Sequence, residues 1–195
     1  MRLLKFRSLV DEQSDLETDR LVARRPAPEH FKSWAAEREA SEHFLRPWEP
    51  AWTSDELSFG AFRARLKQQA ADITSGRGQH WLLFRREAPT VVVGGIALTS
   101  IKRGVSQSGT LGYWLSEKHG GQGLMSEAVD SVCRHAFIAL ELNRVQAGTV
   151  LDNHRSQRLL ERCYFKREGV ARAYLKINNV WQDHIIYARL QNDSI

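Results

Sequence analysis

Apolar residues along the chain recur with two spacings, and their order predicts the order of the secondary-structure elements. In residues 54–75 they return every three or four positions, the spacing of an amphipathic helix: Phe59, Phe62, Leu66, Ala70 and Ile73. In residues 109–116 they alternate, which is typical of a strand. The whole pattern predicts a strand, two helices, three strands, a helix, a strand, a helix and two strands. The predicted ranges are 20–24, 28–44, 54–75, 80–85, 91–101, 109–116, 121–140, 144–151, 154–163, 169–177 and 181–190.

This order predicts an α/β fold with a mixed central sheet of about seven strands and flanking helices. The strand–helix–strand unit over residues 109–151 indicates a parallel strand pair, because a helix connects parallel neighbours. Asn178 and Asn179 separate the last two strands and predict a tight hairpin turn. We expect a single domain over residues 16–195, and a mobile extension over residues 1–15.

Three glycines between a predicted strand and a predicted helix are the strongest chemical signal in the sequence. Gly120, Gly121 and Gly123 permit a tight turn, and the helix that follows offers free N–H groups and a positive dipole end. Together these features favour a phosphate or pyrophosphate ligand. No lysine follows as in Walker A, and Ser126 stands where the dinucleotide motif needs a third glycine. On glycines alone, a turn without a ligand remains open.

The wider segment resembles the acetyl-CoA-binding motif of the GCN5-related N-acetyltransferases (GNAT), [Gln/Arg]-x-x-Gly-x-[Gly/Ala]. Residues 121–128, GQGLMSEA, are similar to the form found in the RimJ/RimL-like branch, the ribosomal-protein-alanine N-acetyltransferases. Segments 43–50, 152–156 and 174–184 resemble the same branch. Gly120 departs from the motif's first position. A second departure is Tyr164, which stands where glycine would take a left-handed conformation, at a cost of about 1 kcal/mol.

The resemblance implies the GNAT fold, in which two parallel strands splay apart and the pantetheine arm of coenzyme A lies between them. Here the splayed pair would be residues 109–116 and 144–151. The implied cofactor is acetyl-CoA, and the implied cofactor-binding residues are Trp114, Leu115, Ser116, Gly120, Gly121, Gln122, Gly123, Leu124, Met125, Ser126, Asn153 and Ser156. Basic side chains that suit the coenzyme's phosphates, unless they are ordinary solvated charges, are Lys118, His119, Arg155, Arg158 and Arg162.

The implied reaction is direct attack of an amine on the thioester, through a tetrahedral intermediate. Glu49 is the first candidate for the base. Asp183 is the alternative carboxylate, unless it is a structural partner of the neighbouring His184 or of Trp181. Ser156 is a candidate acid for the leaving thiolate or an N-cap of its helix. Tyr113 is a further proton donor or a core residue.

Aromatic residues are the candidates for the wall of the acceptor cleft: Trp48, Trp114 and Trp181. They are equally consistent with core packing. The leading function is acetylation of a protein N-terminus, most of all that of a ribosomal protein that begins with alanine. The alternatives are acetylation of a small amine or a peptide-like antibiotic, and a non-catalytic factor that binds coenzyme A or associates with the ribosome.

The composition limits the partners, the metal sites and the cellular compartment that we expect for this protein. The net charge of +5 is compatible with contact to ribosomal RNA, although no RNA-binding motif is visible. No apolar run reaches the length of a membrane span, so we expect no membrane partner. The two cysteines, Cys133 and Cys163, fall at helical positions and predict buried, inert thiols. His135 and His154 lack a second ligand at metal spacing. We expect a cytoplasmic enzyme that is a monomer or a homodimer.

Overall fold

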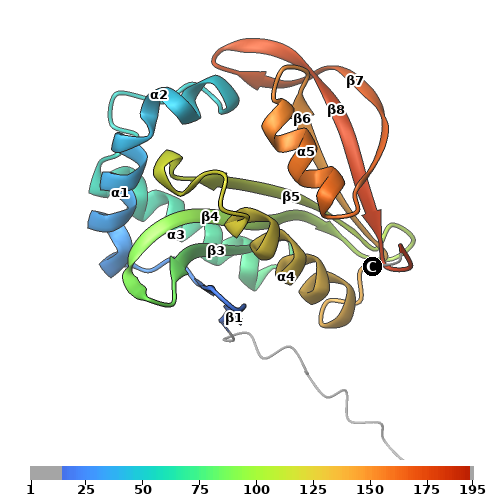
Figure 1. Cartoon of the computed structure of the whole chain (residues 1–195), viewed down its shortest axis with the longest axis horizontal. Helices are drawn as coiled ribbons and strands as arrows, with labels where there is room; N and C mark the ends of the chain where they lie inside the picture. The colour runs from blue at the N-terminus through green and yellow to red at the C-terminus, as the bar shows by residue number, and fades with distance from the viewer. Residues whose placement is uncertain (1–14, 194–195) are drawn as a thin grey trace, which may run out of the picture.

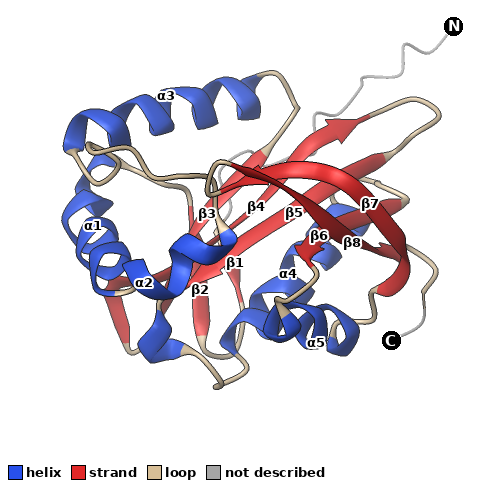
Figure 2. Ribbon diagram, turned by 90° about the horizontal axis from the view of Figure 1, so that it is seen from above, coloured by secondary structure: helices blue, strands red, loops and turns tan. Residues whose placement is uncertain are grey.

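The computed structural model describes residues 15–193, in which one mixed sheet carries helices on both faces (Figures 1 and 2). The predicted extension, residues 1–15, lies outside these residues except for Asp15. The strands are β1 (Leu16–Glu17), β2 (Leu21–Arg24), β3 (Gln79–Arg85), β4 (Ala88–Lys102), β5 (Ser108–Leu115), β6 (Arg144–Val150), β7 (Lys166–Ile177) and β8 (Val180–Leu190). The helices are α1 (Phe31–Ala40), α2 (Glu42–Leu45), α3 (Phe59–Thr74), α4 (Leu124–Ile138) and α5 (His154–Arg162).

The eight strands follow the order β1-β2-β3-β4-β5-β6-β8-β7, and only β5 and β6 pair in parallel. Their pairing covers three positions, from Ser108 with Arg144 to Thr110 with Gln146. Beyond Thr110 the two strands share no pairs, so they diverge toward their carboxyl ends. The mixed sheet and its parallel pair confirm the predicted fold class. The strand that the sequence pattern misses is β1, which has only two residues.

Two apolar clusters fill the space between the sheet and its helices. The apolar stripe predicted for residues 121–140 is buried against one face. It comprises Leu124, Ala128, Val132, Cys133, Ala136 and Phe137 of α4, with Leu140 just beyond the end of the helix. On the other face, Trp34 of α1 and Phe62 of α3 pack against Leu82, Phe84 and Val92. The helices thus cover both faces of the sheet, and the diverging strands lie between α2 and α5 (Figure 1).

The predicted helix over residues 28–44 is broken in the structure. A 3₁₀ turn over Pro28–His30 precedes α1, and Ser41 separates α1 from α2. Ser41 is buried, and its hydroxyl accepts a hydrogen bond from the Glu117 amide at 3.0 Å. The backbone of Ser41, with a φ of −109° and a ψ of 13°, departs from helical values, and this is where the helix breaks. The break turns the chain toward the loop that carries Trp48 and Glu49.

Two other helices begin later than the sequence pattern predicts. Helix α3 begins at Phe59, because the hydroxyl of Ser58 caps it by accepting from the Ala61 amide at 3.1 Å. Helix α4 begins at Leu124 rather than at residue 121, because Gly121 and Gly123 have φ angles of 76° and 77°. Only glycine adopts this left-handed conformation at little cost. The glycines therefore form a turn before the helix.

The hairpin of β7 and β8 closes the chain and reaches over the sheet (Figure 2). Its turn residues, Asn178 and Asn179, have φ angles of 44° and 67°, as the predicted tight turn requires. The Asn178 amide donates to the backbone carbonyl of Glu49 at 3.0 Å. This hydrogen bond joins the hairpin tip to the loop after α2, on the rim of the diverging strands.

Candidate active site

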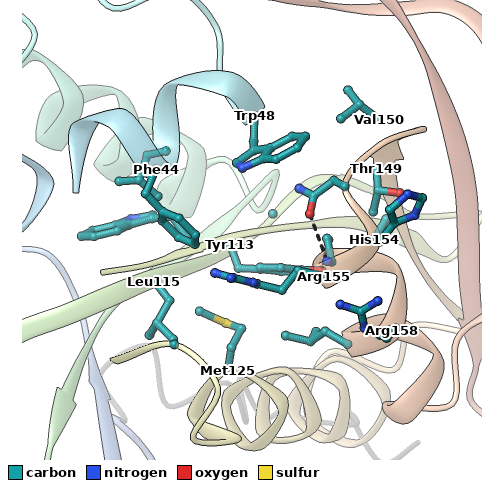
Figure 3. Close-up of a pocket in the computed structure, with 18 of the residues that line it drawn as sticks. Phe44, Trp48, Tyr113, Leu115, Met125, Thr149, Val150, His154, Arg155 and Arg158 are labelled. Atoms are coloured by element: carbon teal, nitrogen blue, oxygen red, sulfur yellow. Dashed lines mark hydrogen bonds between the residues drawn. The ribbon is translucent and has the colours of Figure 1, made fainter. Parts of the chain in front are cut away.

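A cavity of about 1240 Å³ opens where β5 and β6 diverge (Figure 3). Its walls come from the segment after α1, the end of β5, the glycine turn, the start of α4, the end of β6 and the start of α5. Most of the sequence-predicted site residues line it: Trp48, Glu49, Tyr113, Trp114, Leu115, Gly120, Gly121, Gly123, Leu124, Met125, Ser126, Asn153 and Ser156. Four lie outside its lining: Ser116, Gln122, Trp181 and Asp183.

The glycine turn presents backbone donors to the cavity. Gly123 is the N-cap of α4, so the amides of the first helical turn, from Leu124 to Ser126, have no acceptor within the helix. A Cβ built on Gly121 would meet nothing within 4 Å, which leaves open space over the turn. Gln122 faces away, since its carbonyl accepts from Arg20 and its side-chain oxygen from Arg85. The turn suits an anion held by backbone N–H groups.

The register of β5 decides which of its backbone groups face the gap. The Ser116 amide donates to Val93 of β4 at 2.9 Å, and Leu115 pairs with Gly94. Antiparallel pairs alternate between hydrogen-bonded and non-hydrogen-bonded positions, so the amides of Leu115 and Tyr113 point to the β6 side. The Ser116 hydroxyl donates to Glu37 at 2.7 Å. The backbone of Trp114 faces β4, where it pairs with Gly95. Neither Ser116 nor the Trp114 backbone therefore faces the gap.

Three arginines line the cavity from one face of α5: Arg155, Arg158 and Arg162. Their spacing of three and four residues brings them into one row. A Cβ on Gly120, where the motif calls for Gln or Arg, would lie 3.8 Å from Nη1 of Arg155. Arg155 therefore brings a positive charge to the place of the missing side chain. Lys118 instead pairs with Glu37 at 2.6 Å, outside the lining.

Tyr113 and Ser156 meet inside the cavity. The phenol Oη and the Ser156 Oγ are 2.6 Å apart, and burial raises the pKa of Tyr113 far above its usual range, so the phenol stays protonated. Tyr113 also packs against the core, as one of its two alternatives predicts, and its role as a proton donor stays a prediction. The predicted N-cap role of Ser156 is wrong. Asn153 is the cap, and its Oδ1 accepts from the Ser156 amide at 3.0 Å.

The carboxylate of Glu49 lies at the cavity edge in a fixed position. Oε1 accepts from Arg38 at 3.2 Å, and Oε2 accepts from Arg38 at 2.5 Å and from the Trp52 indole at 2.7 Å. Arg38 is buried among the rings of Trp34, Trp52 and Trp114, which lie 4.6–5.7 Å from its guanidinium carbon. Both oxygens of Glu49 are thus engaged by neighbours.

On the closing hairpin, the structure brings a different residue into the cavity from those predicted. Trp181 is 62% exposed and lies outside the lining. Asp183 accepts from the Ala173 amide at 2.8 Å, which holds the bulge of β7 where Ala173 has a φ of 44°. His184, on the opposite face of β8, is 3% exposed and lines the cavity. Sequence reasoning treated His184 only as a neighbour of Asp183, although strand alternation would have separated the two.

Comparison with known proteins decides the family. Residues 20–166 match the family model described as an acetyltransferase (GNAT) domain. The chain belongs to this family. It is 43% identical over 131 residues to the probable N-acetyltransferase YjcK of Bacillus subtilis, covering 67% of this chain and 72% of that protein. It is 32% identical over 174 residues to the [ribosomal protein uS5]-alanine N-acetyltransferase of Escherichia coli, covering 89% of each. Its fold matches Mycobacterium smegmatis RimJ in complex with CoA-disulfide, with a TM-score of 0.82, 24% identity, and coverage of 87% and 81% of the two chains.

This GNAT enzyme uses acetyl-CoA as its acetyl donor, and the cavity has the features that the coenzyme needs. The amides of the glycine turn and the arginine row on α5 suit its phosphates. The gap between β5 and β6, with the Leu115 amide facing it, suits the amide-bearing pantetheine arm. The residues that line the cavity therefore fit coenzyme A.

The two cysteines are buried structural residues, and the described residues offer neither a metal site nor a membrane-spanning helix. Cys133 and Cys163 are buried, and burial raises their pKa values to about 12 and about 11, which confirms inert thiols. Within residues 15–193, no cluster of His, Cys, Asp and Glu has the arrangement of a metal site. No helix in the same part of the chain is long and apolar enough to span a membrane.

Proposed function

We propose that this acetyltransferase modifies the N-terminal α-amine of a protein, with a ribosomal protein that begins with alanine as the leading acceptor. The observation that carries the proposal is the likeness to the Escherichia coli [ribosomal protein uS5]-alanine N-acetyltransferase, which extends over 89% of both chains. A ribosomal acceptor would place the reaction in the cytoplasm and near ribosomal RNA, which the net charge of +5 favours.

The shape of the cavity supports an acceptor that enters opposite the coenzyme. One end is formed by the glycine turn and α5, and the other by Trp48, Glu49 and the end of β6. The hairpin of β7 and β8 reaches this second end through the Asn178–Glu49 hydrogen bond. A peptide end that enters between Trp48 and Val150 would meet the cavity at the Tyr113–Ser156 pair (Figure 3).

Bound acetyl-CoA supplies an activated acetyl thioester, and the chain's own groups serve the transfer. The Leu115 amide faces the gap and stabilises negative charge on an acyl oxygen placed there. Ser156 Oγ, hydrogen-bonded to the protonated Tyr113 phenol, donates a proton to a leaving sulfur. Glu49, held by Arg38, fixes the loop that carries Trp48 against the acceptor end.

The chemistry favours an α-amine over a lysine. A free α-amino group has a pKa of about 7.7–8.0, whereas a lysine side chain has one of about 10.4. Near neutral pH, a modest base is enough to neutralise the first but not the second. The cavity therefore needs only one weak proton acceptor at the acceptor end.

The test is mass spectrometry of a peptide mixture incubated with the protein and acetyl-CoA. The peptides begin with Ala, Ser, Met or Gly, and each carries one internal lysine, so that the α-amine and the lysine compete within one molecule. We expect acetylation of the α-amine, fastest on the alanine peptide. The matched control is the alanine peptide with a blocked N-terminus, which should stay unmodified. Acetylation of lysine alone, or of neither amine on peptides and ribosomal proteins while small amines react, would refute the proposal.

A further inference from the structure

We infer that His184 is the group that takes the proton from the acceptor amine; this rests on the proposed function. His184 lies on β8, paired with Val150 at the end of β6. It is 3% exposed to solvent, yet it lines the cavity together with Ala147, Gly148 and Thr149 of β6. It is therefore a buried titratable group on the wall of the acceptor end.

The hydrogen bonding of the ring sets its tautomer. Nδ1 lies 2.9 Å from the carbonyl oxygen of Gln182. A carbonyl only accepts hydrogen bonds, so Nδ1 carries the hydrogen and Nε2 of the neutral ring keeps a free lone pair. The arrangement is that of a base whose second nitrogen is held in place by the backbone.

The ring is oriented toward the cavity wall. Its Cδ2 atom, which is bonded to Nε2, would lie 3.6 Å from a Cβ built on Gly148. Because Gly148 has no side chain, this edge of the ring approaches the strand that lines the gap. The Tyr174 ring packs edge-on at 5.6 Å between centroids and supports the imidazole from the other strand of the hairpin.

The Tyr113–Ser156 pair and His184 line the same cavity. Tyr113 comes from β5 and His184 from β8, which pairs with β6, so the two lie on the two strands' sides of the gap. Thr149 neighbours Val150, the partner of His184. The Thr149 hydroxyl is buried, lines the cavity and has no hydrogen-bond partner among the described residues. It is a polar group available to a ligand beside the imidazole.

The other acid–base candidates at this end are either engaged by neighbours or, like Asp152 and His154, exposed to solvent. Both oxygens of Glu49 accept from Arg38 or Trp52, and Asp183 accepts from the Ala173 amide. His43 pairs with Glu117 at 3.3 Å, and His154 is exposed at the first position of α5. His184 combines burial, a fixed tautomer and a place in the wall.

The proton balance of the transfer is complete with these groups. The α-ammonium gives one proton to Nε2 of His184 and becomes a nucleophile. As the nitrogen–carbon bond forms and the carbon–sulfur bond breaks, the nitrogen loses a second proton, and the sulfur gains one from Ser156 Oγ. Ser156 recovers its proton from the nitrogen through the Tyr113 hydroxyl or solvent, and the imidazolium releases its own to solvent.

The experiment compares His184→Gln with the wild type on the alanine peptide. We expect kcat to fall by at least 100-fold, within the range found when a general base is removed. Coenzyme A affinity, measured by calorimetry, should stay within about twofold, because His184 lies at the acceptor end. Added imidazole should restore part of the rate in proportion to its concentration. The matched control is His80→Gln, since His80 pairs with Asp72 away from the cavity and should leave kcat unchanged.

A near-wild-type kcat for His184→Gln would overturn the inference, and so would a loss that imidazole does not restore in a variant that still binds coenzyme A. If His184→Gln fails to fold, the smaller His184→Ala replaces it, and rescue by imidazole decides the matter in the same way. Failure of the proposed function looks different, because the wild type itself would not acetylate the peptide. The two ideas are therefore tested separately.

Discussion

At the scale of single residues, Tyr164 occupies a left-handed backbone position that favours glycine over any residue with a side chain. Tyr164 follows the C-cap of α5 with a φ of 64°. Its amide donates to Glu161 and that of Phe165 to Leu160, the two hydrogen bonds of a Schellman motif. The sequence-based expectation of a left-handed tyrosine is thus confirmed. The Tyr164 ring lies 5.4 Å from the guanidinium of Arg189, a contact that offsets part of the strain.

The backbone conformation at Tyr164 leads to a prediction on stability. Tyr164→Gly should be more stable than Tyr164→Ala by about 1 kcal/mol, because both variants lose the ring but only alanine keeps the left-handed penalty. Urea unfolding of the two variants measures the difference. Arg134, exposed in the middle of α4, provides the control, since there Arg134→Gly should be the less stable of its pair by about 1 kcal/mol. The same ranking at both positions would contradict the explanation.

Single residues of the site differ in how well the sequence predicts them. The glycine turn is local, so Gly121 and Gly123 reveal it without knowledge of the rest of the chain. The role of Ser116 depends on its pairing with Val93, and that of Asp183 on the bulge at Ala173. Such partners, 10 or more residues away, are set by strand register, which periodicity does not give. The position of His184 in the cavity wall is different, since the alternation of β8 would have placed it on the face opposite Asp183.

At the scale of elements, α5 combines two functions in nine residues. Leu160 is buried in the core, while Arg155, Arg158 and Arg162 face the cavity. The guanidinium of Arg155 also lies 4.8 Å from the ring of Phe44, across the cavity (Figure 3). Periodicity predicted the helix within one residue, because an amphipathic stripe is a local signal. The break at Ser41 escaped prediction, because the apolar spacing continues through it while the backbone leaves the helical region, with a φ of −109°.

The arginine row gives a prediction on coenzyme binding. Arg155→Ala should weaken the affinity for coenzyme A roughly tenfold, or about 1.4 kcal/mol, by removing a cation beside the glycine turn. Calorimetry with coenzyme A measures this loss, which should shrink as salt rises and screens the exposed charge. Arg134→Ala, which removes an exposed arginine of α4 that does not line the cavity, should leave the affinity unchanged. An equal loss in both variants would point to the net charge rather than to the row.

At the scale of the whole molecule, carboxylates join segments that are far apart in the sequence. Glu37 of α1 accepts from Ser116 and Lys118 beyond β5, and Glu127 of α4 accepts from Thr18 and Arg20. Burial by itself would raise the pKa of each, but these hydrogen bonds outweigh it and hold both pKa values below the usual 4.5. Glu37 thus joins α1 to the segment between β5 and the glycine turn.

These depressed pKa values predict how stability depends on pH. A carboxyl whose pKa is lower in the folded state contributes stability that is fully present above its unfolded pKa and is lost as pH falls through the folded value. The contribution of these two carboxyls to the free energy of unfolding should therefore be level from neutral pH down to about pH 5 and should fall as the pH drops below about 4.5. Partly buried histidines whose pKa values are lowered add a separate loss as the pH falls below about 6.5, and this loss is common to the wild type and the variants. Glu37→Gln should be less stable than the wild type at pH 7, because Lys118 loses its partner, and should show a shallower fall toward pH 3. Urea unfolding across this range measures both slopes, with Glu39→Gln, an exposed residue of the same helix, as the control. If Glu37→Gln and the wild type lose stability in parallel, the network around Glu37 does not link folding to pH.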